Sequence, residues 1–303
     1  MLPAEIIVID DCSEQPLELT TSFSPELPVR FVRHAKNLGP AGSVIDGIRQ
    51  ARCELVVTLN HDDMWEPRFL ERLSHELDAH PEARFAFCDH GIMRAAGEHD
   101  ERLSEVQSTR FGRTRLTGGL LSGAALYDAA LLHKSVAASS FTLVRREALD
   151  LELIAAGGDM WDYFLGVGAC RGGSAVYVEE RLGWYRFSPT MLTTTWVDPR
   201  KQVEMARPQT AILVFILLSP QFKPVHRAVR KRLLLAIRHA LAAAVRTRSV
   251  RGVGRVGTRI LAGARDARRL ARRAGEEPTG RAPTAPAAPV TPAPETATQL
   301  AAE

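Results

Sequence analysis

Residues 56–65, VVTLNHDDMW, decide the fold because an apolar, β-branched run ends abruptly in two adjacent carboxylates, Asp62 and Asp63. Residues 66–79 then carry apolar side chains at helical spacing. This order is typical of a buried strand that delivers acids to the edge of an α/β sheet, where ligands bind outside the carboxyl ends of the strands. Two carboxylates at that edge can hold a divalent metal, although both acids can also serve as caps or turn residues of the following helix.

The same pattern occurs at residues 5–13, where an apolar run ends in Asp10 and Asp11. A near-continuous β-branched run predicts a strand that is buried on both faces. Between the two acidic ends, the chain shows a short alternating strand at 29–33 and a helical pattern from Ser43. The order strand, strand, helix, strand, helix predicts a doubly wound α/β unit.

Further strands are predicted at 85–89 and 175–178, and a strand that runs into a helix is predicted at 141–149. The residues at 94–118 are polar and predict an irregular loop, whereas 157–165 opens a helix with acids in or near its first turn. These elements extend the α/β unit to about residue 200.

The net charge of +4 conceals an uneven distribution along the 303 residues. Residues 1–222 carry a net charge of −8, whereas residues 223–273 hold 16 Lys and Arg against one acid, Asp266. The composition therefore divides the chain into three parts. These are an α/β domain at 1–200, a basic helical appendage at 201–273, and a Pro-, Ala- and Thr-rich tail at 274–303 that we expect to be disordered.

The four cysteines are scattered without a CxxC pair, which argues against a zinc site and a disulfide scaffold and fits a reducing compartment. Residues 1–9 predict a strand and not a signal peptide. The longest apolar run, Ala211–Leu218, is far shorter than the roughly 20 residues that cross a bilayer. We therefore expect a cytoplasmic protein.

Four segments together resemble the family 2-type glycosyltransferases of the GT-A fold, a Rossmann-like α/β fold with a mixed sheet. The resemblance extends from Glu5 to about Arg186. Each motif alone is weak, but four in the same order are fairly specific for the family and say little about the sugar. The segments are VIDDCS (8–13), NLGPAGSVIDGIRQA (37–51), TLNHDDMWEP (58–67) and WDYFLGVGACRGGSAVYVEERLGWYR (161–186).

The resemblance implies transfer of a sugar from a nucleoside diphosphate donor to a hydroxyl of a glycan or lipid-linked acceptor, as in the synthesis of cell-surface polysaccharide or glycolipid. It implies inversion through a single in-line displacement. Mg²⁺ or Mn²⁺ would bridge the pyrophosphate and stabilise the charge of the leaving group. One carboxylate would deprotonate the acceptor.

The resemblance also assigns roles on the donor side, each with a simpler structural alternative. Asp62 and, second, Asp63 would bind the metal, whereas the alternative for Asp63 is a helix cap. The residues assigned to the nucleotide sugar are Asp11, Asn37, Gly39, Asn60 and Arg186, the last as a pyrophosphate clamp. Their alternatives are turn residues and a surface arginine.

On the acceptor side, the helix that opens at 159–162 would supply the catalytic base. Asp162 fits the spacing from the Tyr185–Arg186 block and is preferred, whereas Asp159 fits a pattern in which the acid precedes the aromatic residue by one turn. Either acid could instead belong only to the helix N-terminus. Trp161 would form a sugar or acceptor wall, and a core tryptophan is the alternative.

Several departures from the family pattern bear on activity. Asn60 stands where the family usually has the first metal-motif Asp, Cys12 replaces Gly, and Val44–Ile45 replace Arg-Asn. The family's first strand and helix have no counterpart before Met1, so we expect a shortened version of a longer protein or a weakly catalytic one. A non-catalytic nucleotide-sugar-binding or scaffold protein is therefore the main alternative. A nucleotidyltransferase ranks last because the expected phosphate loop rich in Gly, Arg and Lys is missing.

The basic segment 223–273 fits three uses: a solvated helical face, nucleic-acid binding, or attachment to anionic lipid. No aromatic residues lie between its arginines, which argues against nucleic acid. Within it, Ala228–Val245 combines basic side chains with an apolar set that predicts an interfacial helix. That set is Leu233, Leu234, Ile237 and Leu241. We therefore predict a peripheral contact with the inner face of a membrane.

Overall fold

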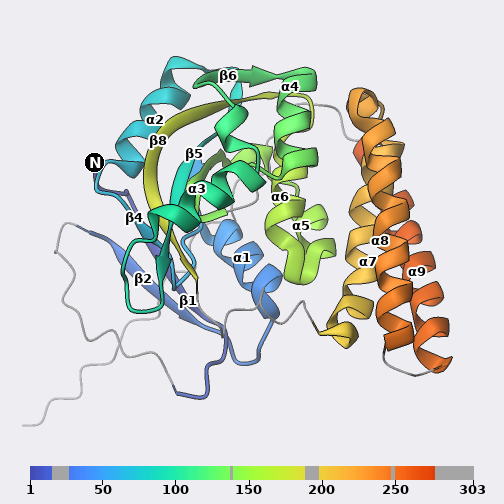
Figure 1. Ribbon diagram of the computed structural model, residues 1–303. Coiled ribbons are helices and arrows are strands. Elements are labelled where there is room, and N and C mark those ends of the chain that lie inside the picture. The colour runs from blue at the N-terminus through green and yellow to red at the C-terminus, as the bar shows by residue number, and fades with distance from the viewer. Residues whose placement is uncertain (16–26, 137–138, 188–197, 247–249, 277–303) are drawn as a thin grey trace, which may run out of the picture.

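The computed structural model describes residues 1–15, 27–136, 139–187, 198–246 and 250–276. These residues form a mixed α/β part and a bundle of C-terminal helices, which stands to the right in Figure 1. The predicted fold class, a mixed α/β sheet followed by helices, is confirmed. The strands fall into two sheets that differ in size and burial.

The smaller sheet consists of β1 (Ile6–Asp10) and β2 (Val29–Arg33), which pair in parallel. The prediction that the first strand is buried on both faces is wrong for Ile6–Ile9, which are half-buried. The reason is that β2 is the strand partner of β1 among the described residues. The expected lack of the family's first strand and helix stays a prediction.

The larger sheet has the order β3-β7-β5-β8-β4, and β6 pairs with the beginning of β8. The long strands β5 and β8 run parallel at its centre, and the pairs at its edges are antiparallel. The strands are β3 (Leu55–Val56), β4 (Met64–Trp65), β5 (Ala83–Arg94), β6 (Gly119–Ser122), β7 (Thr142–Arg145) and β8 (Ser174–Phe187).

The strand that was predicted to lead into Asp62 and Asp63 ends at Val56. Beyond it, the backbone N–H of Asn60 binds the Ser140 hydroxyl and the N–H of Asp63 binds the Asn60 carbonyl, so these groups form a turn and not a ladder. Leu59 is 47% exposed, as expected for a residue that has left the sheet.

The two faces of the larger sheet are covered by different helices because side chains alternate along each strand. On one face, α2 (Phe69–Ala79) packs Phe69, Leu73 and Leu77 against Ala86 of β5 and Val176 of β8. The neighbouring residues of those strands, including Phe85, Phe87 and Tyr177, face the main core. The helices of that core include α1 (Gly39–Gln50), α5 (Leu151–Gly157) and α6 (Trp161–Ala169).

The loop predicted at 94–118 is wrong, because α3 (Glu101–Arg110) occupies much of it. Asp100 caps this helix by accepting from the N–H of Leu103 at 2.9 Å, which stabilises a polar sequence with little apolar periodicity. The prediction failed because the buried side of α3 carries Ser104 and Ser108, so the sequence shows no apolar stripe at helical spacing. The chain then forms β6, α4 (Gly123–Tyr127) and a π-helix at Asp128–His133.

The C-terminal bundle consists of α7 (Pro199–Leu218), α8 (His226–Arg246) and α9 (Val250–Glu276). Its helices lie side by side in Figure 1, and Met205 and Phe215 of α7 belong to the same core as α6. The division of the chain at residue 200 stays a prediction, but the apolar core continues across it. In the described ranges, no helix is long and apolar enough to span a bilayer.

Candidate functional site

Asp11 directly follows β1 and faces the N-terminal end of α1. Its Oδ1 accepts from the N–H of Leu38 at 2.8 Å and lies 2.8 Å from Nδ1 of His34. Burial acts to raise the pKa of Asp11, but the hydrogen bonds from Leu38 and His34 outweigh it, and the pKa is lowered. Asp11 is therefore a fixed, ionised carboxylate at a strand end.

Asn37 and Gly39 form the turn that leads from this corner into α1. The side-chain oxygen of Asn37 accepts from the N–H of Gly39 at 2.9 Å, and Gly39 has a φ of +74°, which favours glycine. These contacts agree with the simpler alternative, in which Asn37 and Gly39 are turn residues and do not line a nucleotide pocket. The role of both residues toward a nucleotide stays a prediction.

An ion pair between a buried acid and an exposed arginine, which the sequence did not reveal, lies beside Asp11. Asp10 is 4% exposed and pairs with Arg33 of β2, whose guanidinium also donates to the carbonyl of Ser13 at 2.7 Å. Cys12, which stands where the resembled family has glycine, has a φ of +63°. A non-glycine residue in that left-handed region carries backbone strain of about 1 kcal/mol, so the turn keeps the glycine geometry without the glycine.

Asp63 of the opening stretch is turned inward. It is 7% exposed, and its carboxylate accepts from the Ser140 hydroxyl at 2.6 Å, from the Asn60 amide at 3.2 Å and from the N–H of Arg186 at 3.1 Å. Burial is the largest influence on the pKa of Asp63 and raises it, although these hydrogen bonds oppose the shift. All three donors fix the acid to the protein, so its role as a metal ligand stays a prediction with less support than for Asp62.

Asp62 is half-buried, and its carboxylate has no hydrogen-bond or ion-pair partner among the described residues. The groups that can hold a metal next to it are the side-chain oxygen of Asn60 and the exposed imidazole of His61. No cluster of three or more His, Cys, Asp or Glu suited to a metal occurs in the part of the chain that the structure describes. The oxygens of Asp62 and Asn60, without the imidazole, fit a Mg²⁺-like ion that takes one carboxylate and several phosphate or water oxygens.

Arg186 of β8, the predicted pyrophosphate clamp, binds the acid turn, which consists of residues 60–63. Its Nε donates to the carbonyl of Asp62 at 2.8 Å, and its Nη1 donates to the carbonyl of Ala95 at 2.9 Å. The guanidinium is therefore engaged by backbone oxygens, and contact with a phosphate stays a prediction.

The two candidate bases differ in their surroundings. Asp159 lies 2.7 Å from the ammonium group of Lys201 on α7, whereas Asp162 accepts from the N–H of Tyr163 at 2.7 Å. Burial raises the pKa of Asp162 to about 6, although the N–H of Tyr163 and the positive charge of Lys134 oppose the shift. A carboxylate with a pKa close to the working pH is suited to general base catalysis. Asp162 therefore remains the preferred candidate.

Lys134 is the main residue of this region that sequence reasoning missed. It follows the π-helix with a φ of +56°, and its ammonium group lies 4.7 Å from the centre of the Tyr163 ring. Burial lowers its pKa. No motif marks Lys134, and the π-helix before it is the structural signal. Trp161 is 7% exposed and packs in the main core, so its acceptor-side role stays a prediction.

The three groups of candidate residues are connected through packing. The turn Ser139–Phe141, which holds Asp63 through Ser140, packs against α6, the helix that carries Asp162. The turn Gly158–Met160, which carries Asp159, packs against α1 behind the Asp11 corner. The structure therefore links the strand-end acids and both candidate bases through α1 and α6.

A family model matches the part of the chain that contains the strand-end acids. The family model described as Glycosyl transferase family 2 matches residues 2–151, which contain both the Asp11 corner and the acid turn at 60–63. Residues 2–151 therefore match glycosyl transferase family 2. The match ends before Asp159, Asp162 and Arg186. These three residues therefore carry family roles only through the sequence resemblance.

Curated relatives match part of the chain at low identity. The succinoglycan biosynthesis protein ExoO of Rhizobium meliloti is 29% identical over 112 residues, which are 37% of this chain and 32% of that protein. The uncharacterized glycosyltransferase YwdF of Bacillus subtilis is 26% identical over 93 residues, which are 31% of this chain and 33% of YwdF. The matches span about a third of each relative's length.

Among solved structures, a mannosyltransferase of Pyrobaculum calidifontis in complex with GDP-Man and Mn²⁺ aligns with this chain. The alignment covers 89% of this chain and 75% of that one, with 16% identity and a TM-score of 0.46.

Proposed function

We propose that the protein is a glycosyltransferase that moves a sugar from a nucleoside diphosphate donor to an acceptor hydroxyl. The observation that carries the proposal is a pair of carboxylates within the family 2 region. Asp11 is fixed at the N-terminal end of α1, and the carboxylate of Asp62, whose carbonyl binds Arg186, has no partner among the described residues. A fixed acceptor of hydrogen bonds suits the nucleoside, and a free carboxylate suits a metal ion beside the diphosphate.

Each residue then has a defined task. Asp11 would accept a hydrogen bond from the nucleoside. Asp62, with the amide oxygen of Asn60 beside it, would hold Mg²⁺ or Mn²⁺. That ion supplies Lewis-acid stabilisation of the diphosphate charge. Asp162 removes the proton from the acceptor hydroxyl, whose oxygen attacks the anomeric carbon as the bond to the diphosphate breaks. A single displacement of this kind inverts the anomeric configuration.

The alternative is a protein of the same family that binds nucleotide sugars without turning them over. Two observations favour it: Asn60 leaves the acid turn with one charge fewer, and Asp159 is paired with Lys201. A donor-hydrolysis assay across uridine and guanosine diphosphate sugars, with and without Mn²⁺, separates the two. Metal-dependent release of nucleoside diphosphate supports the transferase. Metal-dependent binding without release supports the alternative, and the absence of both overturns the proposal.

We also infer that the protein works at an anionic membrane surface, with α8 as the contact. On α8, Leu234 is 64% exposed and Val245 is 66% exposed, and the basic residues Arg230 and Arg238 are exposed on the same helix. The sequence-based apolar set needs correction, because Leu233 and Ile237 are half-buried and Leu233 packs against the core. Exposed apolar side chains between cations suit the headgroup region of anionic lipid.

Such a location on the inner face of the membrane fits a lipid-linked or growing glycan acceptor. The relative from Rhizobium meliloti is named for succinoglycan biosynthesis, which supports an acceptor in cell-envelope polysaccharide.

A further inference from the structure

We propose that His34 is a positioning residue of the donor site: as a charged imidazolium it bridges Asp11 and Asp46 and thereby fixes Asp11 for the nucleoside of the donor. This inference rests on the proposed function, because it concerns the carboxylate that we assign to the nucleoside.

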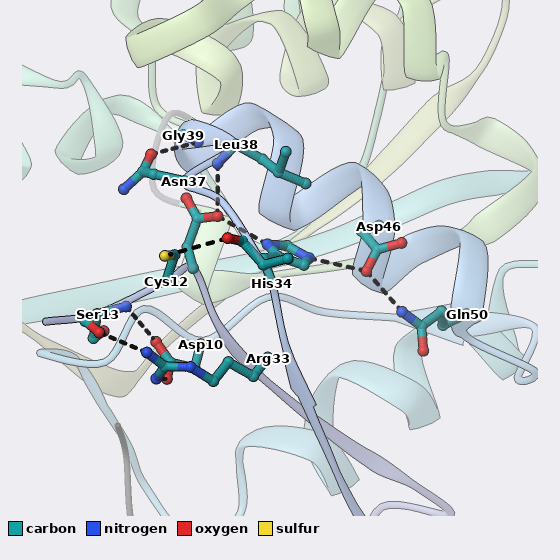
Figure 2. Close-up of polar contacts among 12 residues, drawn as sticks. Asp10, Cys12, Ser13, Arg33, His34, Asn37, Leu38, Gly39, Asp46 and Gln50 are labelled. Atoms are coloured by element: carbon teal, nitrogen blue, oxygen red, sulfur yellow. Dashed lines mark hydrogen bonds and ion pairs between the residues drawn. The ribbon is translucent and has the colours of Figure 1, made fainter. Parts of the chain in front are cut away.

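The geometry of the bridge is defined at both ring nitrogens (Figure 2). Nδ1 of His34 lies 2.8 Å from Oδ1 of Asp11, and Nε2 lies 3.1 Å from Oδ2 of Asp46. The His34 side chain is 9% exposed, whereas the side chains of Asp11 and Asp46 are 22% and 34% exposed, so both contacts are partly buried. The ring thus joins the end of β1 to the middle of α1.

Both contacts require a hydrogen on the imidazole nitrogen, because an ionised carboxylate only accepts hydrogen bonds. An imidazole with hydrogens on both nitrogens is the charged form. A neutral ring would turn a lone pair toward one of the two carboxylates and lose that contact. The pKa of His34 is raised by its hydrogen bonds to Asp11 and Asp46, in agreement with this requirement.

Asp46 is itself held in place by a second hydrogen bond, from Gln50. Its Oδ2 also accepts from the side-chain amide of Gln50 at 2.7 Å, and the Gln50 oxygen accepts from Arg30 of β2 at 2.9 Å. The bridge is therefore the middle of a hydrogen-bond chain that runs from β2 through α1 to the strand end. Asp46 binds Nε2 and Asp11 binds Nδ1 of the same ring, so Asp46 acts on Asp11 through His34.

The charged groups that surround His34 come from three elements. They are Asp11 and its neighbour Asp10 at the end of β1, Asp46 on α1, and Arg33 on β2. Arg33 is already paired with Asp10, which leaves two carboxylates in contact with one imidazole. This balance favours the protonated ring.

The consequence is a donor affinity that depends on the protonation of His34. With His34 charged, Oδ1 of Asp11 is held by Leu38 and His34, and the second oxygen keeps one orientation. The pKa of His34 is raised, so the bridge is complete below that pKa and is lost as the pH rises through it. Nucleotide affinity should fall in the same direction.

Calorimetric titration of the full-length protein with UDP and with GDP, each with Mg²⁺, tests the proposal between about pH 6 and 9. We expect the wild-type affinity to fall about tenfold, or 1.4 kcal/mol, across the transition. His34→Asn places a neutral amide near the Nδ1 position and should retain binding without the pH transition. His34→Ala should bind weakly throughout. Asp46→Asn, which touches Asp11 only through His34, should move the transition to lower pH.

Two results would overturn this role while leaving the proposed function intact. One is nucleotide binding by the wild type that does not change with pH, and the other is a transition in His34→Asn identical to that of the wild type. Absence of UDP and GDP binding at every pH contradicts both the role and the proposed function. A proton NMR titration of the His34 ring then still reports whether Asp46→Asn lowers its pKa, which separates a failed bridge from a failed donor site.

Discussion

The hydroxyl of Ser140 donates to the carboxylate of Asp63 at 2.6 Å, and both residues are buried. The same hydroxyl oxygen accepts from the N–H of Asn60 at 3.1 Å. Ser140 therefore ties the acid turn to the entry of β7 and draws one of two adjacent acids inward. The neighbouring Asp62 keeps its carboxylate free of protein partners among the described residues, so the two carboxylates have different surroundings.

Replacing Asp63 and replacing Asp62 should affect different properties, namely stability and metal-dependent nucleotide binding. Asp63→Ala leaves Ser140, Asn60 and the N–H of Arg186 without their acceptor and should lower the free energy of unfolding by about 2–3 kcal/mol. Asp62→Ala should change it by less than about 0.5 kcal/mol but abolish metal-dependent nucleotide binding. Denaturant unfolding and calorimetry measure both. Equal loss of stability in the two variants would contradict the division of tasks.

The pH dependence of turnover should report Asp162. Because the ionised carboxylate acts as the base and its pKa is about 6, kcat/KM should fall as the pH is lowered through that value. The positive charge of Lys134 lowers this pKa, so Lys134→Met should move the acidic limb to higher pH. Asp162→Asn should lower kcat about 10²–10⁴-fold while nucleotide binding remains. An acidic limb that Lys134→Met does not move would argue against Asp162 as the base.

Membrane contact should depend on the basic residues of α8. In flotation with phosphatidylglycerol vesicles, Arg230→Glu with Arg238→Glu should release the protein, because the change removes attraction of about 1 kcal/mol per cation near the surface. Phosphatidylcholine vesicles should not bind the wild type. Arg102→Glu with Arg110→Glu on α3 makes the same change of net charge at exposed positions and serves as the control. Equal release by both double variants would contradict a contact through α8.

Close packing in the bundle predicts a contrast between two glycines of α9. A Cβ at Gly263 would lie 2.4 Å from the carbonyl oxygen of Arg207 on α7, so Gly263→Ala should separate the helices and cost about 1–3 kcal/mol. Gly257 has nothing within 4 Å of that position. Gly257→Ala should therefore stabilise the helix by up to about 1 kcal/mol. Thermal unfolding of the two variants measures the contrast, and destabilisation by both would contradict it.

Local pattern predicted those elements whose apolar residues recur at regular spacing. The run at Ile6–Ile9 predicted β1, the spacing of Phe69, Leu73 and Leu77 predicted α2, and the basic amphipathic pattern predicted α8. In contrast, α3 is polar and is stabilised by the cap at Asp100, so its apolar periodicity is weak. Hydrophobic period alone could not separate it from a loop.

A site residue could be predicted where its motif lies at the end of a predicted strand. It was harder to predict where residues far away in the chain decide how its side chain is oriented. Asp11 follows its strand as the resemblance implies. The inward orientation of Asp63 depends on Ser140 and Arg186, which are 77 and 123 residues away in the chain. Lys134 and the bridge at His34 depend in the same way on contacts between elements. The roles of Asn37, Gly39, Arg186 and Trp161 toward a ligand stay predictions.

A crystal structure of the protein with a nucleoside diphosphate and Mn²⁺ tests the central claim most directly. The account predicts the nucleoside within hydrogen-bond distance of Asp11 and the ion about 2.1 Å from a carboxylate oxygen of Asp62, with Asp63 still bound to Ser140. A nucleotide elsewhere on the molecule, or an ion held without Asp62, would contradict it.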